Sequence, residues 1–402
     1  MDSLPAGTPA LLRSLNARAV LDVLGTGELL ARTDVAATTG QSKTTVAQTL
    51  RALTATGVVV EAGLDHDRRG PAATLYRVDP DYAFGLGVDV ARDRVRVALV
   101  DVTGTVRARA ERRDVKPSST ARARATAELA RACAEDVETR LGTGATVEPT
   151  RAVAAVPAIV GPDGRTIRRV PGFEKGGTAL HDALQDALGC PVTLENDLNL
   201  SALAEQCHGV AQGVGSFVVL GLGDGFGAGI VIDGRLHRGA AGGAGEVSFL
   251  PSPDRPLGAE AMGAAALSAI AKDYGLPEDI SAHDLVDRVE NGDLAATEAL
   301  EVVARRIGTI AAGVELVLEP ELFVLTNQAA RPALAERVTR FLAEGIAVLP
   351  IRVVPSTLGG DSVVVGAARA ASDALREEVF RAAAAVPAAG ARDADADEEV
   401  AS

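Results

Sequence analysis

Hydrophobic residues near the start of the chain recur at helical spacing, in three blocks separated by glycines. Gly25 and Gly27 end the first block, and Gly40 separates the second block from the third. Thr33 is predicted to cap the second helix and Ser42 the third, because each supplies a side-chain oxygen at a helix start. The first helix is predicted to bury an apolar face made of Leu11, Leu12, Leu15, Ala19 and Val23, and the third a face made of Val46, Leu50 and Leu53.

Residues 58–80 change to the alternating pattern of β-strands. Strands are predicted at 58–60 and 74–78, with a polar turn at 65–71 between them. Three helices followed by a hairpin are typical of a winged helix-turn-helix, which we assign to residues 8–80. In this module the helix that begins after Ser42 would lie in the DNA major groove. DNA contacts are predicted at Ser42, Lys43, Thr44, Thr45, Gln48 and Arg51, and in the hairpin at Arg68 and Arg69. A purely structural or protein-binding winged helix is the alternative.

From residue 84 the chain alternates strands and helices in the manner of an α/β domain. Paired strands are predicted at 85–90 and 95–101, and a long helix at 121–141. Further strands are expected at 152–156, 192–195, 217–220, 229–232 and 322–325, and further helices at 198–208, within 260–320 and at 331–344. Residues 363–366 lead into a last helix. The acidic segment 384–402 is predicted to be a disordered tail.

Composition limits the possible functions. The 402 residues suggest two or three domains, and a hydrophobic fraction of 47% supplies cores built from Ala, Val and Leu. Only 3% of residues are aromatic, which argues against a stacking platform for single-stranded nucleic acid. The net charge of -14 also argues against a nucleic-acid partner. However, residues 1–80 contain eight basic and eight acidic residues, so the negative charge belongs to the rest of the chain.

The cysteines and the N-terminal segment indicate a cytoplasmic protein. Cys133, Cys190 and Cys207 are scattered, which fits neither a disulfide framework nor the spacing of zinc ligands. Residues 1–12 lack the basic start and apolar run of a signal peptide. We find no apolar stretch long enough for a membrane span and expect no membrane partner.

Several segments taken together resemble the ROK family of repressors, open reading frames and sugar kinases. The resemblance covers about residues 10–380. It implies a multidomain protein in which a two-lobed α/β actin-like domain at 83–380 follows the winged helix, with lobes at roughly 83–200 and 201–380 and a cleft between them. It also implies a homodimer or homotetramer. The segments that carry it are 195–199, 223–234, 238–246 and 355–359.

The resemblance fails at the loops that hold ATP in family kinases. Those kinases use an Asp-x-Gly-Gly-Thr turn, whose matching residues here run from Asp89 to Asp93 without the glycines or the threonine. Asp224 replaces a threonine of the second phosphate loop, and residues 325–328 lack the glycines of the adenosine loop. Asp93 and Asp224 would repel a triphosphate by several kcal/mol, on the order expected of close like charges. We therefore expect no kinase activity, no enzyme function and no nucleotide cofactor.

The sugar side of the cleft is partly retained. The resemblance places Asp197 at the position of the catalytic base, beside Asn196, with Glu246 and Glu260 as sugar contacts. Ala158, Arg169 and Phe249 depart from the pattern of the family kinases. An acidic or phosphorylated ligand that Arg169 could hold is an alternative to a neutral sugar. The predicted effector-binding residues are Arg169, Asn196, Asp197, Glu246, Phe249 and Glu260.

These residues also have structural interpretations. Asp197 could cap a helix, Asn196 could turn the chain, and Glu246 could pair with Arg238. The family's zinc-binding cysteines are missing from 251–259, so no structural zinc is expected.

The sequence thus predicts a DNA-binding transcription regulator, a repressor or a dual regulator of carbohydrate metabolism, with double-stranded operator DNA as partner and a sugar-type effector. One alternative is a sugar kinase with an appended DNA-binding domain. Another is a regulator with a vestigial pocket, which responds to a protein partner or to its own abundance.

Overall fold

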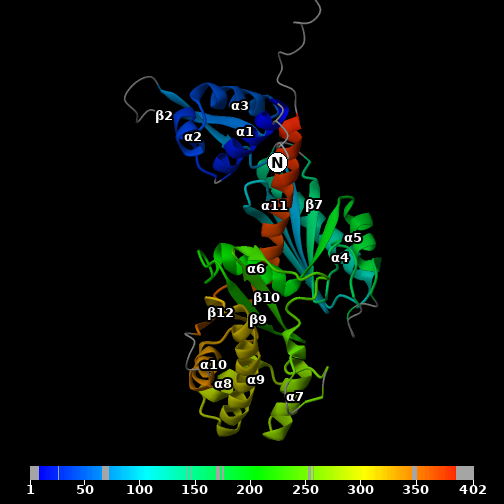
Figure 1. The fold of residues 1–402 in the computed structure, drawn as a ribbon. Helices are drawn as coiled ribbons and strands as arrows, with labels where there is room; N and C mark the ends of the chain where they lie inside the picture. Colours follow the sequence, from blue (N-terminus) through cyan, green and yellow to red (C-terminus); the bar gives the residue numbers. More distant parts are fainter. Residues whose placement is uncertain are drawn as a thin grey trace, which may run out of the picture.

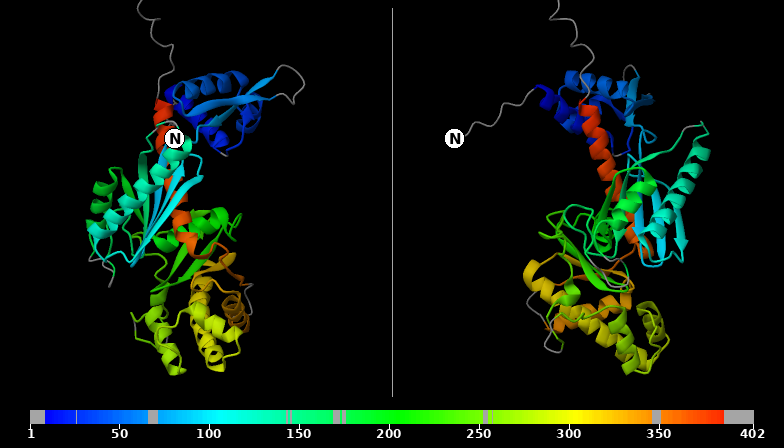
Figure 2. Two further views of the ribbon diagram at one scale, coloured as in Figure 1. Left: turned by 180° about the vertical axis from the view of Figure 1, so that it is seen from behind. Right: turned by 90° about the vertical axis from the view of Figure 1, so that its right-hand side faces the viewer.

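The protein is elongated and consists of three bodies in a row, as the computed structural model in Figure 1 shows. The winged helix lies at one end, the first lobe in the middle and the second lobe at the other end. Figure 2 shows that the last helix, α11 (Ser362–Ala385), runs from the middle of the molecule to the winged helix. The structure describes residues 9–25, 27–65, 72–142, 144, 146–168, 173, 176–251, 255–256, 258–345 and 351–385.

The N-terminal body has three helices and a small antiparallel sheet. The helices are α1 (Pro9–Leu24), α2 (Arg32–Thr39) and α3 (Lys43–Ala55). The sheet has the order β1-β3-β2, formed by Leu30–Ala31, Ala73–Val78 and Val59–Asp65. The predicted cap of α3 is confirmed, because the Ser42 hydroxyl accepts a hydrogen bond of 3.1 Å from the Thr45 amide. Val46, Leu50 and Leu53 are buried, as predicted.

Two local predictions in this body are wrong. Leu11, Leu12 and Leu15 are 52–57% exposed, and the buried residues of α1 are Ala17, Val20, Leu21 and Leu24. Only the C-terminal half of α1 packs into the winged-helix core, so its N-terminal leucines extend beyond that core. Thr33 does not cap α2, because the helix begins two residues earlier than predicted, at Arg32, with Ala31 in the cap position. The amide of Ala31 instead donates to the Asp34 carboxylate.

The first lobe is a five-stranded sheet of order β6-β5-β4-β7-β8. β4 pairs antiparallel with β5 and parallel with β7, which in turn pairs parallel with β8. The strands β4 and β5 are buried along nearly their whole length, because α4 and α5 cover one face and α11 the other. The elements are β4 (Phe84–Val90), β5 (Arg94–Asp101), β6 (Val106–Arg113), α4 (Ser119–Leu141), β7 (Pro149–Val156), α5 (Ala179–Leu188) and β8 (Val192–Asn196).

The second lobe is another five-stranded sheet, of order β11-β10-β9-β12-β13. α6 (Asp197–His208) joins the lobes and packs against β10 with Leu198 and Ala202. Two short 3-10 helices also occur: η1 (Val247–Phe249) follows β11 in the chain, and η2 (Gly359–Asp361) follows β13. The other elements are β9 (Phe217–Leu222), β10 (Phe226–Ile232), β11 (Arg235–Leu236), α7 (Ala264–Asp273), α8 (Ala282–Glu290), α9 (Leu294–Leu318), β12 (Leu322–Asn327), α10 (Pro332–Gly345) and β13 (Val353–Pro355).

The last helix begins at a different residue, and packs on a different lobe, from those predicted. Residues 363–366, expected to precede it, already form its first turn. α11 was assigned to the second lobe, yet it packs on the first sheet, where an added Cβ on Gly87 would stand 2.2 Å from the Ala368 nitrogen. Residues 386–402 of the predicted tail lie outside the described residues. None of the helices within the described ranges is long and apolar enough to cross a membrane.

Candidate functional site

The corner between β8 and α6 holds two of the predicted polar residues, Asn196 and Asp197. The Asn196 side chain caps α6 by accepting from the amides of Leu198 and Asn199, at 2.9 and 3.1 Å. Its amide nitrogen donates to the Ala158 carbonyl at 3.2 Å. Asp197 is the first residue of the helix, so Asn196 rather than Asp197 is the cap.

Glu195 fastens this corner to the second lobe. One oxygen of this buried carboxylate accepts from the Asn196 amide and from the Asn199 side chain, both at 2.9 Å. The other oxygen accepts from Arg238 at 2.6 Å. Arg238 therefore pairs with Glu195, and the alternative pairing with Glu246 is wrong. This partner could not be found from local sequence, because the two residues are 43 positions apart.

Carboxylates from both lobes influence each other's pKa values. Burial raises the pKa of Asp197 to about 7, and the negative charges of Asp89 and Glu246 raise it further. The pKa of Glu246 is raised by loss of hydration and by the charge of Glu260. These charge effects link Asp197 to Asp89 and Glu246, and Glu246 to Glu260. That Asp197, Glu246 and Glu260 form one effector site stays a prediction. Phe249 is 43% exposed on η1, and Arg169 lies outside the described residues.

Asp89, the retained residue of the first phosphate loop, is neutralised by an arginine of the next strand. Arg96 lies opposite Asp89 in the β4–β5 register and donates twice to one oxygen of its buried carboxylate, at 2.9 and 2.7 Å. The same guanidinium donates to Asp361 at 3.1 Å and to the Gly360 carbonyl at 2.5 Å. The Asp89 carboxylate is therefore already bound by the guanidinium of Arg96.

An ion pair joins the two turns that match the phosphate loops of family kinases. Arg92, in the turn between β4 and β5, lies 2.8 Å from the Asp224 carboxylate in the turn between β9 and β10. Asp93 and Asp224 were expected to act as repulsive groups, but the charge of Asp224 is compensated by Arg92. The sequence feature that could have indicated this pair is Arg92, the basic residue directly before Asp93.

The predicted DNA-reading face is presented by α3. Lys43, Thr44, Gln48 and Arg51 are exposed, and no hydrogen bond or ion pair joins their side chains to any other described residue. Ser42 and Thr45 are engaged in the helix cap, where their hydroxyls are 2.9 Å apart. Arg68 and Arg69 of the hairpin lie outside the described residues.

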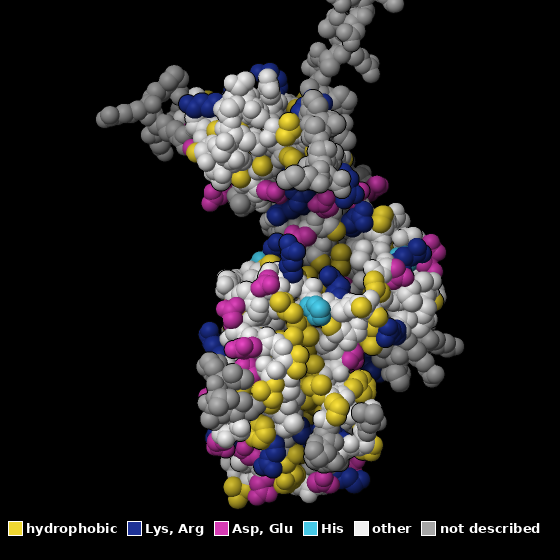
Figure 3. Space-filling view, viewed as in Figure 1, with side chains coloured by type: hydrophobic (Ala, Val, Ile, Leu, Met, Phe, Trp, Pro, Cys, Tyr) yellow, Lys and Arg dark blue, Asp and Glu magenta, His cyan; other side chains and the backbone are white. Residues whose placement is uncertain are grey.

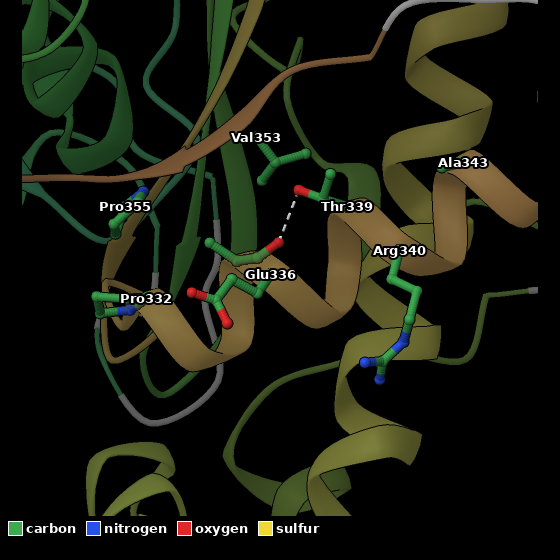
Figure 4. A pocket seen from close by; sticks show the side chains of 8 residues that line it. Pro332, Glu336, Thr339, Arg340, Ala343, Val353 and Pro355 are labelled. Carbon is green, nitrogen blue, oxygen red and sulfur yellow. Dashed lines mark hydrogen bonds between the residues drawn. The ribbon is translucent and has the colours of Figure 1, made fainter.

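A shallow cavity of about 380 Å³ lies elsewhere, between α10 and β13 at the outer edge of the second lobe (Figure 4). Thr339 donates to the Ala335 carbonyl of its own helix, and Arg340 pairs with Glu301. The cavity contains none of the predicted site residues, so it plays no part in the site. Its lining is Pro332, Ala335, Glu336, Thr339, Arg340, Ala343, Val353 and Pro355.

The three cysteines are free thiols, and burial raises the pKa of each. Within the described residues, no group of three or more His, Cys, Asp or Glu side chains is placed to hold a metal ion.

Comparisons with known proteins point to one family. The ROK family pattern matches residues 85–374. A xylose repressor of Caldicellulosiruptor bescii is 25% identical over 347 residues, which cover 80% of this chain and 85% of the relative. The crystal structure of a ROK family transcriptional regulator, a homologue of the E. coli MLC protein, superimposes with a TM-score of 0.72 at 20% identity and covers 93% of this chain and 99% of its own. A ROK family glucokinase from Streptomyces griseus, in complex with glucose and AMPPNP, reaches 0.58 at 23% identity, over 72% of this chain and all of the kinase.

Proposed function

The chain belongs to the ROK family, and from this premise we propose that it is a DNA-binding transcription regulator of the repressor type, which senses a sugar or sugar-derived effector in its cleft. The observation that carries the proposal is the reading helix α3. It is capped by Ser42 and exposes Lys43, Gln48 and Arg51, whose side chains form no hydrogen bond or ion pair with another residue of the described ranges. The ROK family transcriptional regulator matches 93% of the chain, whereas the Streptomyces griseus glucokinase matches 72%.

Double-stranded operator DNA is the proposed partner. Lys43 and Arg51 can reach phosphates or guanine edges, and Gln48 can bond an adenine edge. Two winged helices of a homo-oligomer would occupy the halves of a pseudo-palindromic operator.

The proposed cleft does not phosphorylate its ligand. Arg96 and Arg92 pair with Asp89 and Asp224, the acidic groups at the loops that hold phosphate in family kinases. A triphosphate that entered here would meet an ion pair across the cleft and would have to break it.

The effector is proposed to bind beside Asp197, Glu246 and Glu260. Carboxylates and amides suit a ligand with vicinal hydroxyls, because they accept and donate hydrogen bonds in fixed directions. Xylose is the first sugar to test, since relatives that align over most of the chain are xylose repressors. Arg169 and Phe249 remain proposed contacts.

The decisive experiment is selection of binding duplexes from a random-sequence pool, followed by affinity measurements over a range of salt concentrations. Lys43→Ala is expected to weaken binding of all duplexes and to lower the salt slope by about one. Gln48→Ala is expected to change base preference. Arg131→Ala, on the exposed face of α4, is the matched control. If both α3 variants bind as the parent does, α3 is not the reading helix.

A sugar kinase is the second candidate, and the pKa of Asp197 near 7 favours it, because such a carboxylate can accept a proton at neutral pH. Thermal-shift measurements with sugars, sugar acids, sugar phosphates and Mg-ATP separate the candidates. A shift with one sugar class that Asp197→Ala abolishes, without a shift from Mg-ATP, supports the regulator. Phosphorylation of a sugar that Asp197→Ala abolishes supports the kinase. A flat response to all ligands supports a regulator with a vestigial pocket.

A further inference from the structure

One helix connects the cleft to the DNA-reading body. α11 covers the inner face of the first sheet with its first half and reaches the winged helix with its second half (Figures 1 and 2). Its residues from Val363 to Ala371 pack with β5, β7 and α6. Leu375, Val379 and Phe380 are instead part of the winged-helix core.

The first half of α11 is packed backbone against backbone. A Cβ on Gly366 would stand 1.8 Å from the Leu200 carbonyl oxygen of α6, whose first turn contains Asp197. A Cβ on Gly87 would stand 2.2 Å from the Ala368 nitrogen, and Gly87 is two residues from Asp89. Contacts this close leave no room for α11 to slide against the cleft residues.

The second half of α11 is attached to the winged helix by directional contacts. Arg376 donates to the Gly25 carbonyl at the end of α1, at 3.1 Å. The same guanidinium donates to the carbonyls of Val102 and Thr103 in the first lobe, the former at 2.8 Å. A single side chain therefore joins three segments that are distant in the sequence.

An ion pair reinforces this contact from the side of the winged helix. Arg18 on α1 lies 2.5 Å from Glu377 on α11. The Arg18 guanidinium also stands 5.1 Å from the centre of the Phe380 ring, a cation–π distance. Figure 3 shows side chains of both charges gathered at the narrow region where the two bodies meet.

We propose that Arg376, together with the Arg18–Glu377 pair, is a positioning joint that makes the winged helix and the first lobe one rigid body, through which movement of the cleft reaches the reading helix. The inference rests on the proposed function for its regulatory consequence, but the joint itself is a property of the folded chain. A ligand can shift the DNA-bound arrangement only if the two sites bias the same element. α11 packs against α6, which begins with Asp197, and against the winged-helix core.

The first test needs neither DNA nor effector. Hydrogen exchange and thermal unfolding of the full-length parent are expected to show the winged helix and the first lobe opening together. Arg376→Ala is expected to make the amides of α1 to α3 exchange at least about tenfold faster than those of β4 and β5. Arg131→Ala is the control, because this exposed arginine lies on α4 and belongs to neither the Arg376 contacts nor the Arg18–Glu377 pair.

Exchanging the two charges distinguishes loss of the Arg18–Glu377 ion pair from a general loss of stability. Arg18→Glu and Glu377→Arg are each expected to uncouple the two bodies, and the double variant is expected to restore joint opening. If the parent already opens in two separate steps, or if no single variant changes the exchange pattern, the joint does not exist.

The second test measures regulation with a duplex from the random-sequence selection and the sugar that gives a thermal shift. In the parent, the sugar is expected to change duplex affinity at least about fivefold. In Arg376→Ala, the thermal shift caused by the sugar should persist, while its effect on duplex affinity should fall toward onefold. An unchanged effect would overturn the regulatory role of the joint. A parent that binds no duplex would refute the proposed function instead, and the exchange experiment would still decide whether the joint exists.

Discussion

Replacement of Asp197 by asparagine should stabilise the protein, and more so as the pH rises. The pKa of this carboxyl is about 7 in the folded chain, against 3.8 for an ordinary aspartate. Burial and the charges of Asp89 and Glu246 favour its protonated form. Asparagine keeps the side-chain oxygen that accepts from the Leu198 amide at 2.9 Å, but it has no charge to bury.

The size and sign of this effect follow from proton linkage. The folded state holds its proton up to about pH 7, whereas the unfolded carboxyl loses it near pH 4, so stability falls between these values as the pH rises. The full shift of about 3 pKa units corresponds to ~4 kcal/mol at pH 8, of which ~2 kcal/mol is already present at pH 5. Asp197→Asn should remove this penalty.

The assay is urea denaturation of the parent and the variant at pH 5, 6, 7 and 8. Asp163→Asn is the control of opposite sign. Hydrogen bonds from Thr166 and the Arg165 amide lower the pKa of Asp163 to about 2, so its stabilising contribution is present at neutral pH and lost in acid. A gain for Asp197→Asn that is equal at pH 5 and pH 8 would show that this carboxyl is not perturbed.

Three further changes test the fold around the site, each by urea denaturation. Ser42→Ala removes the cap of α3 and should lower the unfolding free energy by about 1 kcal/mol. Arg96→Met leaves the buried Asp89 carboxylate without its partner and should cost about 3–5 kcal/mol; a loss below about 1 kcal/mol would mean that the pair is solvated. Gly87→Ala pushes a Cβ against the backbone of α11 and should cost about 3 kcal/mol, whereas Gly223→Ala, with open space around it, should be tolerated.

Sequence reasoning succeeded where a structure depends on neighbours in the chain. The cap at Ser42 and the buried positions Val46, Leu50 and Leu53 follow from periodicity and from a side chain that bonds three residues ahead. The antiparallel pair β4–β5 follows from two apolar runs with a turn between them. The family pattern at 85–374 likewise follows from loops whose residues are contiguous.

Contacts between distant segments had to come from the tertiary structure. Arg238 pairs with Glu195 instead of Glu246, and Arg92 with Asp224, because the packing of the two lobes determines which charges meet. The face of α1 that is buried was mispredicted for the same reason, since the helical period shows which residues share a face but not how far a partner extends along it.

Asp197 combines both kinds of information. Its place at the start of α6 follows from the local sequence 195–199, whereas its pKa near 7 depends on burial and on charges from β4 and from the second lobe. Similarly, the sequence predicted α11 as a helix, and only the fold placed it against both the first sheet and the winged helix. The periodicity of a sequence determines which face of its own helix or strand a side chain occupies. Which residue that side chain contacts is determined only when the helices and strands pack together.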